Sequence, residues 1–380
     1  MTASQRSGPP VVAVYRRVLL GASETFVRNE ALALRRYSVL FVGEERSDGL
    51  PLPAGQVVLG VPGGRYRRAL RHRLPGFDPH TRIARLCRAR GVALVHSHFG
   101  TDSLPALDLA QALDVPLVVT YHGFDACLSD KAMRTFPDYA AYLVRRAELF
   151  DRAAAIIAVS GFIAGEVVRQ GAPEAKLRVH HVGVPLGPEP SDTPREPVVL
   201  FVGRHVEKKG VGDLLEAMSR VCASVPSARL VVVGDGPLRS GLEAHARRLE
   251  LDAQFVGWQT PEQIAARLRE VRVLCVPSRR AANGDAEGLP TVIPEAAAHG
   301  VPAVGTRHSG IPEAIEEDRS GLLADEGDVE GIARQLTAVL TDDGLWRRLS
   351  AGARENAARN FDPQRQAEEL ERIYDEALAA

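Results

Sequence analysis

Short apolar runs alternate with helical patterns along this chain, and the whole alternation occurs twice. Runs rich in Val, Ile and Leu predict buried strands, and the amphipathic stretches between them predict connecting helices. Such an alternation is typical of a parallel sheet with helices on both faces. The sequence therefore predicts an α/β fold with two Rossmann-like, doubly wound parallel-sheet domains. The predicted strands are 11–15, 38–42, 57–59, 92–96, 117–121, 154–159, 198–202, 229–233, 254–256, 271–276, 303–305 and 321–323.

The chain length agrees with two domains joined by one linker. At 380 residues the chain is long for a single core. Pro, Gly and Ser accumulate over 183–197 without periodicity, which indicates the linker. We expect an N-terminal domain over 1–185 and a C-terminal domain over 190–361. A ligand would lie in the cleft between them, at the carboxyl ends of the strands.

The last residues, 362–380, predict a helix with Pro363 in its first turn. One face of this helix is apolar, so we expect that face to be buried. The residues on that face are Ala367, Leu370, Ile373 and Leu378.

The composition excludes several classes of protein. No apolar run approaches the roughly 18–20 residues that span a bilayer, and the N-terminus lacks a signal-peptide core, so we expect a cytoplasmic protein. Four scattered cysteines without a Cys-x-x-Cys pair indicate reduced, mostly buried thiols rather than a zinc site or a disulfide framework. They are Cys87, Cys127, Cys222 and Cys275.

Charge is distributed unevenly between the two halves. Residues 1–190 hold 24 Lys and Arg against 17 Asp and Glu, which is about +7, and the remainder carries about −8. Nine arginines lie within Arg65–Arg90, with Asp78 as the only acid there. Two interpretations stay open: peripheral binding to an anionic membrane face or a phosphate-bearing acceptor, and a solvated helix face. Nucleic acid is not expected as a partner, because this segment lacks a run of interleaved aromatic residues for stacking.

The stretch 284–300 carries the strongest functional signal. Glu287 and Glu295 lie eight residues apart, which is close to two turns of an α-helix. If the segment between them is mostly helical, both carboxylates face the same way. Gly288 allows a ligand to approach the backbone, and free N–H groups at a helix start attract phosphate. Together these features indicate a nucleotide-sugar site.

The wider sequence around the two glutamates resembles a known family. Glu287-Gly-Leu-Pro-Thr-Val-Ile-Pro-Glu295-Ala, then Gly300-Val-Pro-Ala-Val and His308-Ser-Gly-Ile-Pro-Glu-Ala-Ile, is similar to the donor-site signature of family 4 (group 1) retaining glycosyltransferases. The exopolysaccharide, or colanic-acid-like, branch is the nearest. The resemblance implies the GT-B fold, in which the C-terminal helix packs back on the N-terminal domain. It also implies that Glu287 binds donor-sugar hydroxyls and Glu295 the ribose. The other donor-site residues of this stretch are Gly288, Leu289 and Thr291.

One residue departs from the family pattern. Pro294 directly precedes Glu295, where the family usually has an apolar residue other than proline. Because proline is tolerated only in the first turn of a helix, we expect this helix to start later than the family pattern implies. That affects the orientation of Glu295, whereas Glu287 is unaffected.

A second group of residues follows the first predicted strand of the C-terminal domain. Arg204 comes directly after that strand, and Lys209 comes five residues later at a helix start, which is a geometry for clamping a diphosphate. Two cations there would stabilise the charge that develops as the sugar–phosphate bond breaks. The family has an Arg and a Lys at this spacing; the alternative is a basic loop in solvent. Gly203 and the turn containing Gly234 and Gly236 are expected to lie along the nucleotide through their backbone.

Histidines mark the strand ends of the N-terminal domain. His122 follows strand 117–121 in a segment that resembles the family's Thr-x-His-Gly, which implies that it binds a donor-sugar hydroxyl rather than acting as a base. A structural histidine is the alternative. His96 and His98 share one side of a strand and would suit a metal, but no third ligand is evident. Ser23 is predicted to cap the helix 24–36. The residues expected on the acceptor side are Ser23, Glu24, Thr25, Phe26, His98 and Asp125.

The favoured interpretation is a metal-independent, retaining glycosyltransferase that moves a hexose-type sugar from a nucleoside diphosphate to a glycan, a lipid-linked glycan or a small molecule. No Asp-x-Asp is present to bind a metal–diphosphate complex, so no metal or other cofactor is expected. The catalytic candidates are Glu287, His122, Arg204 and Lys209. A non-catalytic nucleotide-sugar sensor or assembly subunit remains an alternative. An NAD(P)-dependent oxidoreductase is a weaker one, because Gly241 is misplaced for Gly-x-Gly-x-x-Gly. Sugar, base, acceptor, linkage and oligomeric state stay open.

Overall fold

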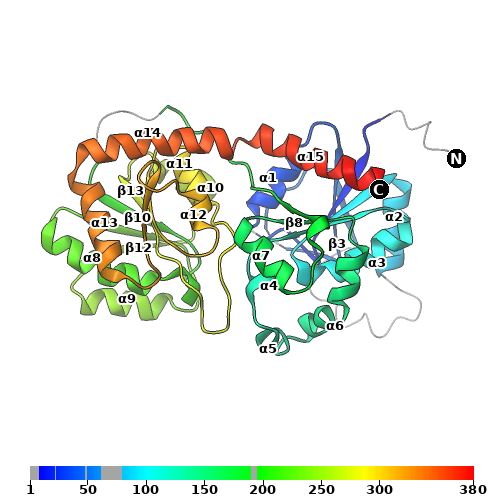
Figure 1. Ribbon diagram of the computed structural model, residues 1–380, viewed down its shortest axis with the longest axis horizontal. Helices are drawn as coiled ribbons and strands as arrows, with labels where there is room; N and C mark the ends of the chain where they lie inside the picture. Colours follow the sequence, from blue (N-terminus) through cyan, green and yellow to red (C-terminus); the bar gives the residue numbers. More distant parts are fainter. Residues whose placement is uncertain (1–7, 22, 48, 61–78, 190–194) are drawn as a thin grey trace. The chain divides into compact units, whose positions relative to one another are not determined.

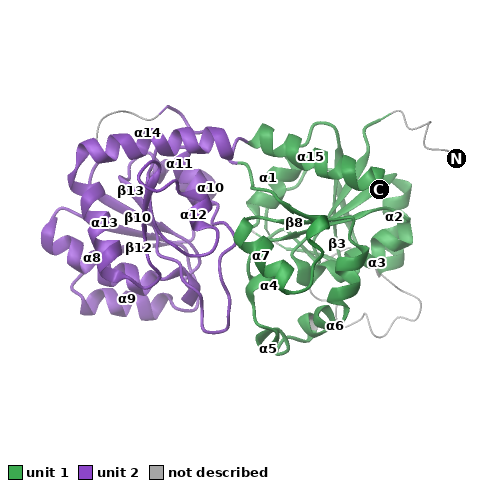
Figure 2. Cartoon of the chain, in the orientation of Figure 1, with its two compact units in different colours: residues 1–183, 363–380 green, residues 184–362 purple. Residues whose placement is uncertain are grey.

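A computed structural model describes residues 8–21, 23–47, 49–60, 79–189 and 195–380 of the chain. The chain divides into two compact units (Figure 2). Unit 1 contains residues 1–183 and 363–380, and unit 2 contains residues 184–362. Each unit is built on its own parallel sheet, which confirms the predicted α/β fold class.

The sheet of unit 1 has seven parallel strands in the order β5-β3-β1-β6-β7-β8-β9. From β1 the chain first adds β3 and β5 on one side and then β6 to β9 on the other. This reversal is expected for a doubly wound sheet. Its strands are β1 Val11–Tyr15, β3 Ser38–Gly43, β5 Val57–Leu59, β6 Val92–His98, β7 Leu117–Tyr121, β8 Ala155–Ala158 and β9 Leu177–Val179. Its helices are α1 Thr25–Ala33, α2 Pro79–Ala89, α3 Ser103–Leu113, α4 Phe124–Cys127, α5 Asp130–Met133, α6 Pro137–Arg152, α7 Gly161–Arg169 and α15 Pro363–Ala379. A separate pair joins β2 Val18–Leu19 to β4 Glu45–Arg46.

Unit 2 repeats the plan with six parallel strands in the order β12-β11-β10-β13-β14-β15. The strands are β10 Val198–Val202, β11 Arg229–Val233, β12 Ala253–Gly257, β13 Val273–Val276, β14 Ala303–Thr306 and β15 Gly321–Ala324. The helices are α8 Val211–Ser224, α9 Arg239–Arg248, α10 Pro261–Leu268, α11 Val292–Ala297, α12 Ile311–Ala314, α13 Val329–Thr341 and α14 Asp343–Asn360. The neighbouring strands β13 and β14 and the edge strand β15 are buried throughout, which explains their nearly continuous apolar sequences.

Helix α15 packs against α1 in unit 1 (Figure 1). Its residues Leu370, Ile373 and Tyr374 enter the same core as β1 and β3. The Glu371 carboxylate accepts the backbone N–H groups of Arg35 and Arg36 at 2.6 and 2.7 Å. These bonds follow the end of α1 at Ala33, so the predicted helix 24–36 stops three residues early.

The predicted apolar face of α15 is correct except at its end. Ala367, Leu370 and Ile373 are buried, whereas Leu378 is 40% exposed. Ala377 occupies the buried position instead, because the stripe continues through Tyr374 at helical spacing. Leu378 therefore lies on the solvent side of the last turn.

Gly210 lets the loop after β10 approach the end of β13. Its φ is +65°, and an added Cβ would lie 1.9 Å from the carbonyl oxygen of Pro277.

Gly210→Ala should therefore lower the free energy of unfolding by at least about 2 kcal/mol, because alanine is strained at this positive φ and its Cβ would displace the loop. Thermal or urea unfolding measures this. The matched control is Gly212→Ala in α8, where an added Cβ meets nothing within 4 Å; it should be neutral or stabilise by up to about 1 kcal/mol. Equal losses in the two variants would contradict the steric argument.

Candidate active site

The loops after β10 and β13 lie at the same edge of the unit 2 sheet, because these two strands are parallel neighbours. The first loop contains the short 3-10 turn Glu207–Lys209, and the second contains residues 277–291. The backbone N–H of Arg279 donates to the carbonyl oxygen of Lys208 at 2.8 Å and joins the two loops. Lys208 and Arg279, which are 71 positions apart in the sequence, are thus held side by side.

Lys209 and Glu287 form an ion pair at this edge. Lys209 Nζ lies 2.8 Å from Glu287 Oε1, and the Glu287 carboxylate is buried. Burial by itself opposes ionisation of Glu287, but Lys209 and Lys208 outweigh it and lower the pKa of this carboxyl below its usual value. Ser278 Oγ also donates to Oε1, at 3.3 Å. Among the described residues no partner of Glu287 Oε2 is present, so this oxygen can accept hydrogen bonds from a ligand.

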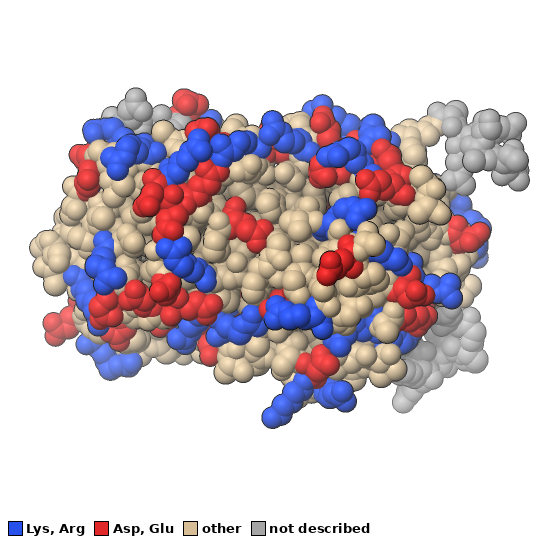
Figure 3. All heavy atoms as spheres, viewed as in Figure 1, with Lys and Arg blue, Asp and Glu red and all other residues tan. Residues whose placement is uncertain are grey.

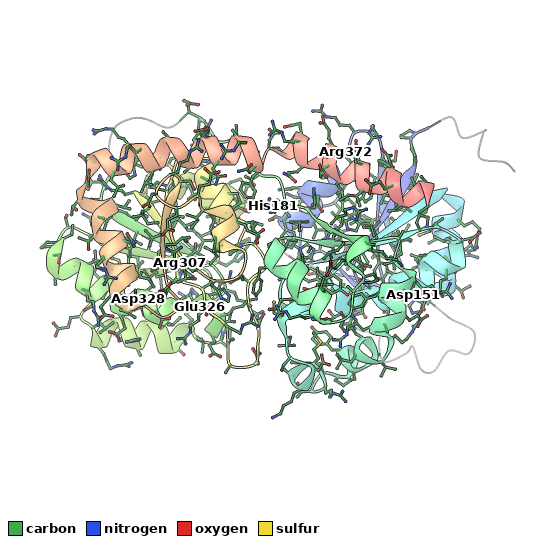
Figure 4. The ribbon with its side chains drawn as sticks, in the orientation of Figure 1. Asp151, His181, Arg307, Glu326, Asp328 and Arg372 are labelled. Atoms are coloured by element: carbon green, nitrogen blue, oxygen red, sulfur yellow. The ribbon has the colours of Figure 1, made fainter. Side chains whose placement is uncertain are left out.

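His308 supports Glu287 from the loop after β14. The backbone N–H of Glu287 donates to His308 Nε2 at 3.4 Å, while His308 Nδ1 lies 2.7 Å from Glu326 Oε1. This pattern places the imidazole proton on Nδ1, because Nε2 acts as the acceptor. Glu326, labelled in Figure 4, also accepts the backbone N–H of Arg280 at 3.0 Å. Glu287 is therefore held through both its side chain and its backbone.

Lys208, the neighbouring lysine, has a different environment. Its Nζ lies 2.9 Å from Asp285 Oδ1 and donates to the carbonyl oxygen of Ala286 at 3.0 Å. Lys208 thus holds the loop that precedes Glu287, whereas Lys209 contacts the Glu287 carboxylate itself.

Glu295 lies on α11, and the helical-spacing argument for the two glutamates is wrong. The helix covers only Val292–Ala297, so Glu287 belongs to an irregular loop. The helix also starts before Pro294, which is its third residue and is tolerated because it lies in the first turn. Burial raises the pKa of Glu295, and a side-chain hydrogen bond from Thr291 offsets this only in part. Without a cation in contact among the described residues, Glu295 is easier to protonate than Glu287.

The remaining donor-site residues surround this ion pair. The backbone N–H of Gly310 donates to the carbonyl oxygen of Gly288 at 3.0 Å, which fixes the turn before Leu289. Leu289 is buried, and Thr291 is the N-terminal boundary residue of α11.

Two glycine turns complete the edge next to β10. Gly234 has φ +125°, and an added Cβ would lie 1.9 Å from the carbonyl oxygen of Gly203, so the turns after β10 and β11 touch through their backbones. An added Cβ at Gly236 would lie 2.6 Å from the carbonyl oxygen of His205. Arg204 is exposed, and its guanidinium has no ion-pair partner in the described part of the chain. Arg204 can therefore reach a bound anion without breaking a contact.

In unit 1, Asp125 organises the ends of β6 and β7. Its carboxylate is fully buried and accepts the backbone N–H groups of His122, Gly123 and Gly100 at 2.9 to 3.0 Å. Burial raises the pKa of Asp125, and these three donors oppose the rise. Asp125, predicted on the acceptor side, is therefore placed under the strand ends as a backbone anchor.

Three histidines of unit 1, His96, His98 and His122, form a contiguous cluster. His98 Nδ1 lies 3.0 Å from His122 Nε2, and the rings of His96 and His98 are 4.3 Å apart. Both ring nitrogens of His96 are engaged, with Tyr374 Oη at 2.6 Å and Thr120 Oγ1 at 2.7 Å. Burial lowers the pKa of all three histidines, and that of His96 to about 4. Among the described residues, no three His, Cys, Asp or Glu side chains gather as a metal site would require.

The segment 23–26 is held by an arginine that sequence reasoning missed. Arg16 contacts Glu24 Oε1 at 2.5 Å and Asp102 Oδ2 at 2.5 Å. The prediction that Ser23 caps α1 is wrong: the boundary residue is Glu24, which makes no side-chain cap, and Ser23 is exposed. The Glu24 carboxylate instead bonds Arg16 and the backbone N–H of Gly21.

Thr25 and Phe26 begin helix α1. Thr25 is half-buried, and the Phe26 ring lies 5.0 Å from the His122 ring. Phe99, which was also not predicted, contacts the same histidine, with the two ring centroids 4.5 Å apart. The Arg16 guanidinium lies 4.2 Å from the centroid of the Phe99 ring. An arginine directly after the first strand, followed by the acid of 23–26, was the one sequence signal for this arrangement.

Family comparison covers nearly the whole chain. Residues 189–356 match the family described as glycosyl transferases group 1, and residues 23–187 match the one described as glycosyltransferase family 4. The chain is a group 1 glycosyltransferase. The predicted family and enzyme class are thereby confirmed.

Curated relatives of this glycosyltransferase include enzymes of polysaccharide biosynthesis. The protein of Escherichia coli that carries the name colanic acid biosynthesis glycosyltransferase WcaL is 30% identical over 70% of this chain. The amylovoran biosynthesis glycosyltransferase AmsK of Erwinia amylovora is 30% identical over 65% of this chain. These alignments span 66% and 61% of the two relatives' own lengths.

Solved structures confirm the GT-B fold of the glycosyltransferase. Sucrose-phosphate synthase from Thermosynechococcus elongatus superposes with a TM-score of 0.77 at 21% identity, covering 97% of this chain and 99% of that one. Anabaena HepE in complex with UDP-glucose gives a TM-score of 0.73 at 17% identity, covering 96% and 99%.

The arginine-rich segment of the glycosyltransferase is described only in part. Arg65, Arg67, Arg68, Arg71 and Arg73 lie outside the described residues. On α2 and directly after it, Arg88 and Arg90 donate to the carbonyl oxygens of Ala112 and Gly55 in their own unit. On the face drawn in Figure 3, Lys and Arg side chains alternate with Asp and Glu side chains. No helix in the described ranges combines the length and apolarity needed to cross a membrane.

Proposed function

We propose that this enzyme is a retaining glycosyltransferase that takes a hexose-type sugar from a nucleoside-diphosphate sugar and needs no metal ion. The observation that carries the proposal is the buried Lys209–Glu287 ion pair, at 2.8 Å, beside two close glycine turns at the carboxyl edge of the unit 2 sheet. This edge is where parallel α/β sheets bind nucleotides. The names of the relatives, and a structural neighbour in complex with UDP-glucose, support the same donor class.

The cations of this edge suit a diphosphate leaving group. Lys209 has three N–H donors and uses one for Glu287, so it can also reach a phosphate oxygen. Arg204 is free to add a second positive charge. As the bond between the anomeric carbon and the phosphate oxygen breaks, negative charge develops on the diphosphate, and fixed cations stabilise it. We propose that Lys209 and Arg204 do so in place of a metal.

The carboxylates suit the sugar and the ribose. Glu287 Oε1 is used by Lys209 and Ser278, which leaves Oε2 to accept hydrogen bonds from donor-sugar hydroxyls. Glu295, which lacks a cation, would bind the ribose hydroxyls. Backbone groups of Gly203, Gly234, Gly236 and Gly288 would line the nucleotide. In unit 1, His122 would bind a further sugar hydroxyl through Nδ1.

Retention of the configuration at the anomeric carbon follows from a front-face reaction. The acceptor hydroxyl oxygen bonds to the anomeric carbon on the side from which the diphosphate leaves, and the acceptor proton passes to the departing phosphate oxygen. No side-chain nucleophile is required. The Lys209–Glu287 pair would hold the leaving phosphate and the sugar in a fixed relative position during this step.

We propose a growing glycan on a lipid carrier as the acceptor, with a small molecule as the second candidate. The polysaccharide-biosynthesis names of WcaL and AmsK support the first. Such an acceptor would bring the enzyme to the inner membrane face, where arginines on α2 such as the exposed Arg85 could contact anionic lipid.

A donor panel in EDTA tests this function. UDP-, GDP- and TDP-sugars are measured for binding and for slow hydrolysis, with wild type and Glu287→Ala side by side. We expect one donor to bind and hydrolyse in EDTA, and both signals to fall in the variant. Binding without hydrolysis, and without transfer to any glycan acceptor, would favour the nucleotide-sugar sensor. No binding of any nucleotide sugar would overturn the proposed function.

A further inference from the structure

We propose that His98 is a positioning residue that fixes the ring orientation and the neutral tautomer of His122. This inference rests on the proposed function, in which His122 binds a sugar hydroxyl. It changes the predicted role of His98, which the sequence placed on the acceptor side.

The contact between the two rings is direct. His98 is the last residue of β6 and His122 follows the last residue of β7, and the two strands are parallel neighbours. His98 Nδ1 lies 3.0 Å from His122 Nε2, and the rings stack with an interplanar angle of 24°. His98 is only 1% exposed, whereas His122 is half-buried. His98 is thus positioned behind His122, away from ligands that His122 can reach.

His98 is itself held from behind. The His96 ring lies 4.3 Å from it, and His96 is fixed by Thr120 and by Tyr374 of α15. The Arg16 guanidinium donates to the His98 carbonyl oxygen at 3.3 Å. A buried ring with such neighbours has little freedom to turn, so the position of its Nδ1 is well defined.

Two aromatic rings restrict the rotation of the His122 ring. Phe26 lies 5.0 Å and Phe99 4.5 Å from it, measured between ring centroids. Phe99 has φ +68°, an unfavourable conformation for a bulky residue, and Arg16 stacks on it at 4.2 Å. Backbone strain of this kind persists where the surroundings over-determine it, often next to functional groups. The whole arrangement presents one ring nitrogen, Nδ1 of His122, for which the described residues supply no partner.

The hydrogen bond between His98 and His122 couples the tautomer of one ring to that of the other. A neutral imidazole carries a single N–H, so either His98 Nδ1 donates to His122 Nε2 or the reverse. In the first case the proton of His122 is on Nδ1, which then donates to a ligand. In the second case Nδ1 is an acceptor for a sugar hydroxyl. His98 therefore decides what His122 offers to the sugar, as second partners of histidines commonly do.

Kinetics and NMR together test the proposal. His98→Leu removes the polar partner and keeps a buried apolar side chain, whereas His98→Asn keeps a polar atom near the position of Nδ1. We expect His98→Leu to lower kcat/KM about 10- to 100-fold, and His98→Asn to restore most of the loss. In a His122→Ala background, His98→Leu should cost less than about twofold, because its effect passes through His122. Equal losses in both backgrounds would overturn the proposal and indicate a merely structural role.

The NMR measurement needs no substrate, so it separates this inference from the proposed function. Ring 15N shifts of His122 should report one neutral tautomer in the wild type and a mixture in His98→Leu. His180→Gln is the matched control, because His180 is buried in the same unit but bonds Glu30 instead. Unchanged His122 shifts in His98→Leu would refute the inference. Changed shifts in a protein that binds no nucleotide sugar would support it while the proposed function fails.

Discussion

Replacing Lys209 with alanine should lower kcat/KM by about 100- to 1000-fold, the range seen when one group that stabilises transition-state charge is removed. The variant loses the cation that we propose stabilises the leaving diphosphate, and it leaves Glu287 buried without its 2.8 Å partner. Steady-state kinetics with the donor found in the panel measures the effect. The matched control is the adjacent Lys208→Ala, which removes the contacts with Asp285 and Ala286 and leaves the Lys209–Glu287 ion pair in place. It should cost less than tenfold, and losses of equal size would contradict the distinct role of Lys209.

The pH profile gives the same prediction a second readout. In the wild type Lys209 helps to lower the pKa of Glu287, so the carboxylate stays ionised well below neutral pH. Without Lys209, burial acts with less opposition and the pKa rises. The acidic limb of kcat/KM should therefore move to higher pH in Lys209→Ala. An unmoved limb would show that ionised Glu287 is not required.

Replacing Asp125 with alanine should have the largest effect on stability. The change leaves the backbone N–H groups of His122, Gly123 and Gly100 without their acceptor in a buried setting. At about 1–3 kcal/mol for each unsatisfied group, with some relaxation, we expect a loss of roughly 3–5 kcal/mol in the free energy of unfolding. Urea unfolding followed through a signal from unit 1 measures it.

A surface aspartate serves as the control for Asp125. Asp108 is exposed and pairs with Arg145 at 2.9 Å. Asp108→Ala should change stability by less than about 1 kcal/mol, as exposed ion pairs usually do. Asp125→Asn should fall between the two, because one acceptor oxygen remains. A change at Asp125 as small as that at Asp108 would mean that water replaces the lost acceptor.

Much of the fold was predictable because buried parallel strands have distinctive sequences. β1, β5, β7, β10 and β11 begin and end at the predicted residues, since each consists mainly of Val, Leu and other apolar residues. β9 was not predicted. It has three residues at the edge of the sheet, with a polar Arg178 at its centre, so it carries no apolar run.

The candidate site was predictable in its residues and not in its geometry. The glutamates and Lys209 were found by motif, but the reason given for the glutamate spacing was wrong, because a loop rather than a helix carries Glu287. Which lysine meets Glu287 depends on Gly210 and the approach of two loops distant in sequence, which local patterns do not encode. Arg16 was missed for a similar reason. Its hydrogen-bond partners come from two segments, Glu24 close to it in sequence and His98 and Asp102 at and just after the end of β6, which is distant in sequence.

Unit 2 is inserted within unit 1, since the chain leaves unit 1 after Gly183 and returns at Pro363. During synthesis on a ribosome, unit 2 emerges as one uninterrupted block, whereas unit 1 must wait for α15. Domains usually fold in the order in which they are made. Unit 1 is an exception, because its first strands are made before unit 2 but its last helix is made after unit 2. Until Glu371 and Tyr374 are made, the end of α1 lacks its carboxylate acceptor and His96 Nδ1 lacks its tyrosine partner, although His96 Nε2 can already bond Thr120. A nascent chain stalled before α15 would therefore hold a complete unit 2 and, in unit 1, a histidine cluster without its tyrosine partner.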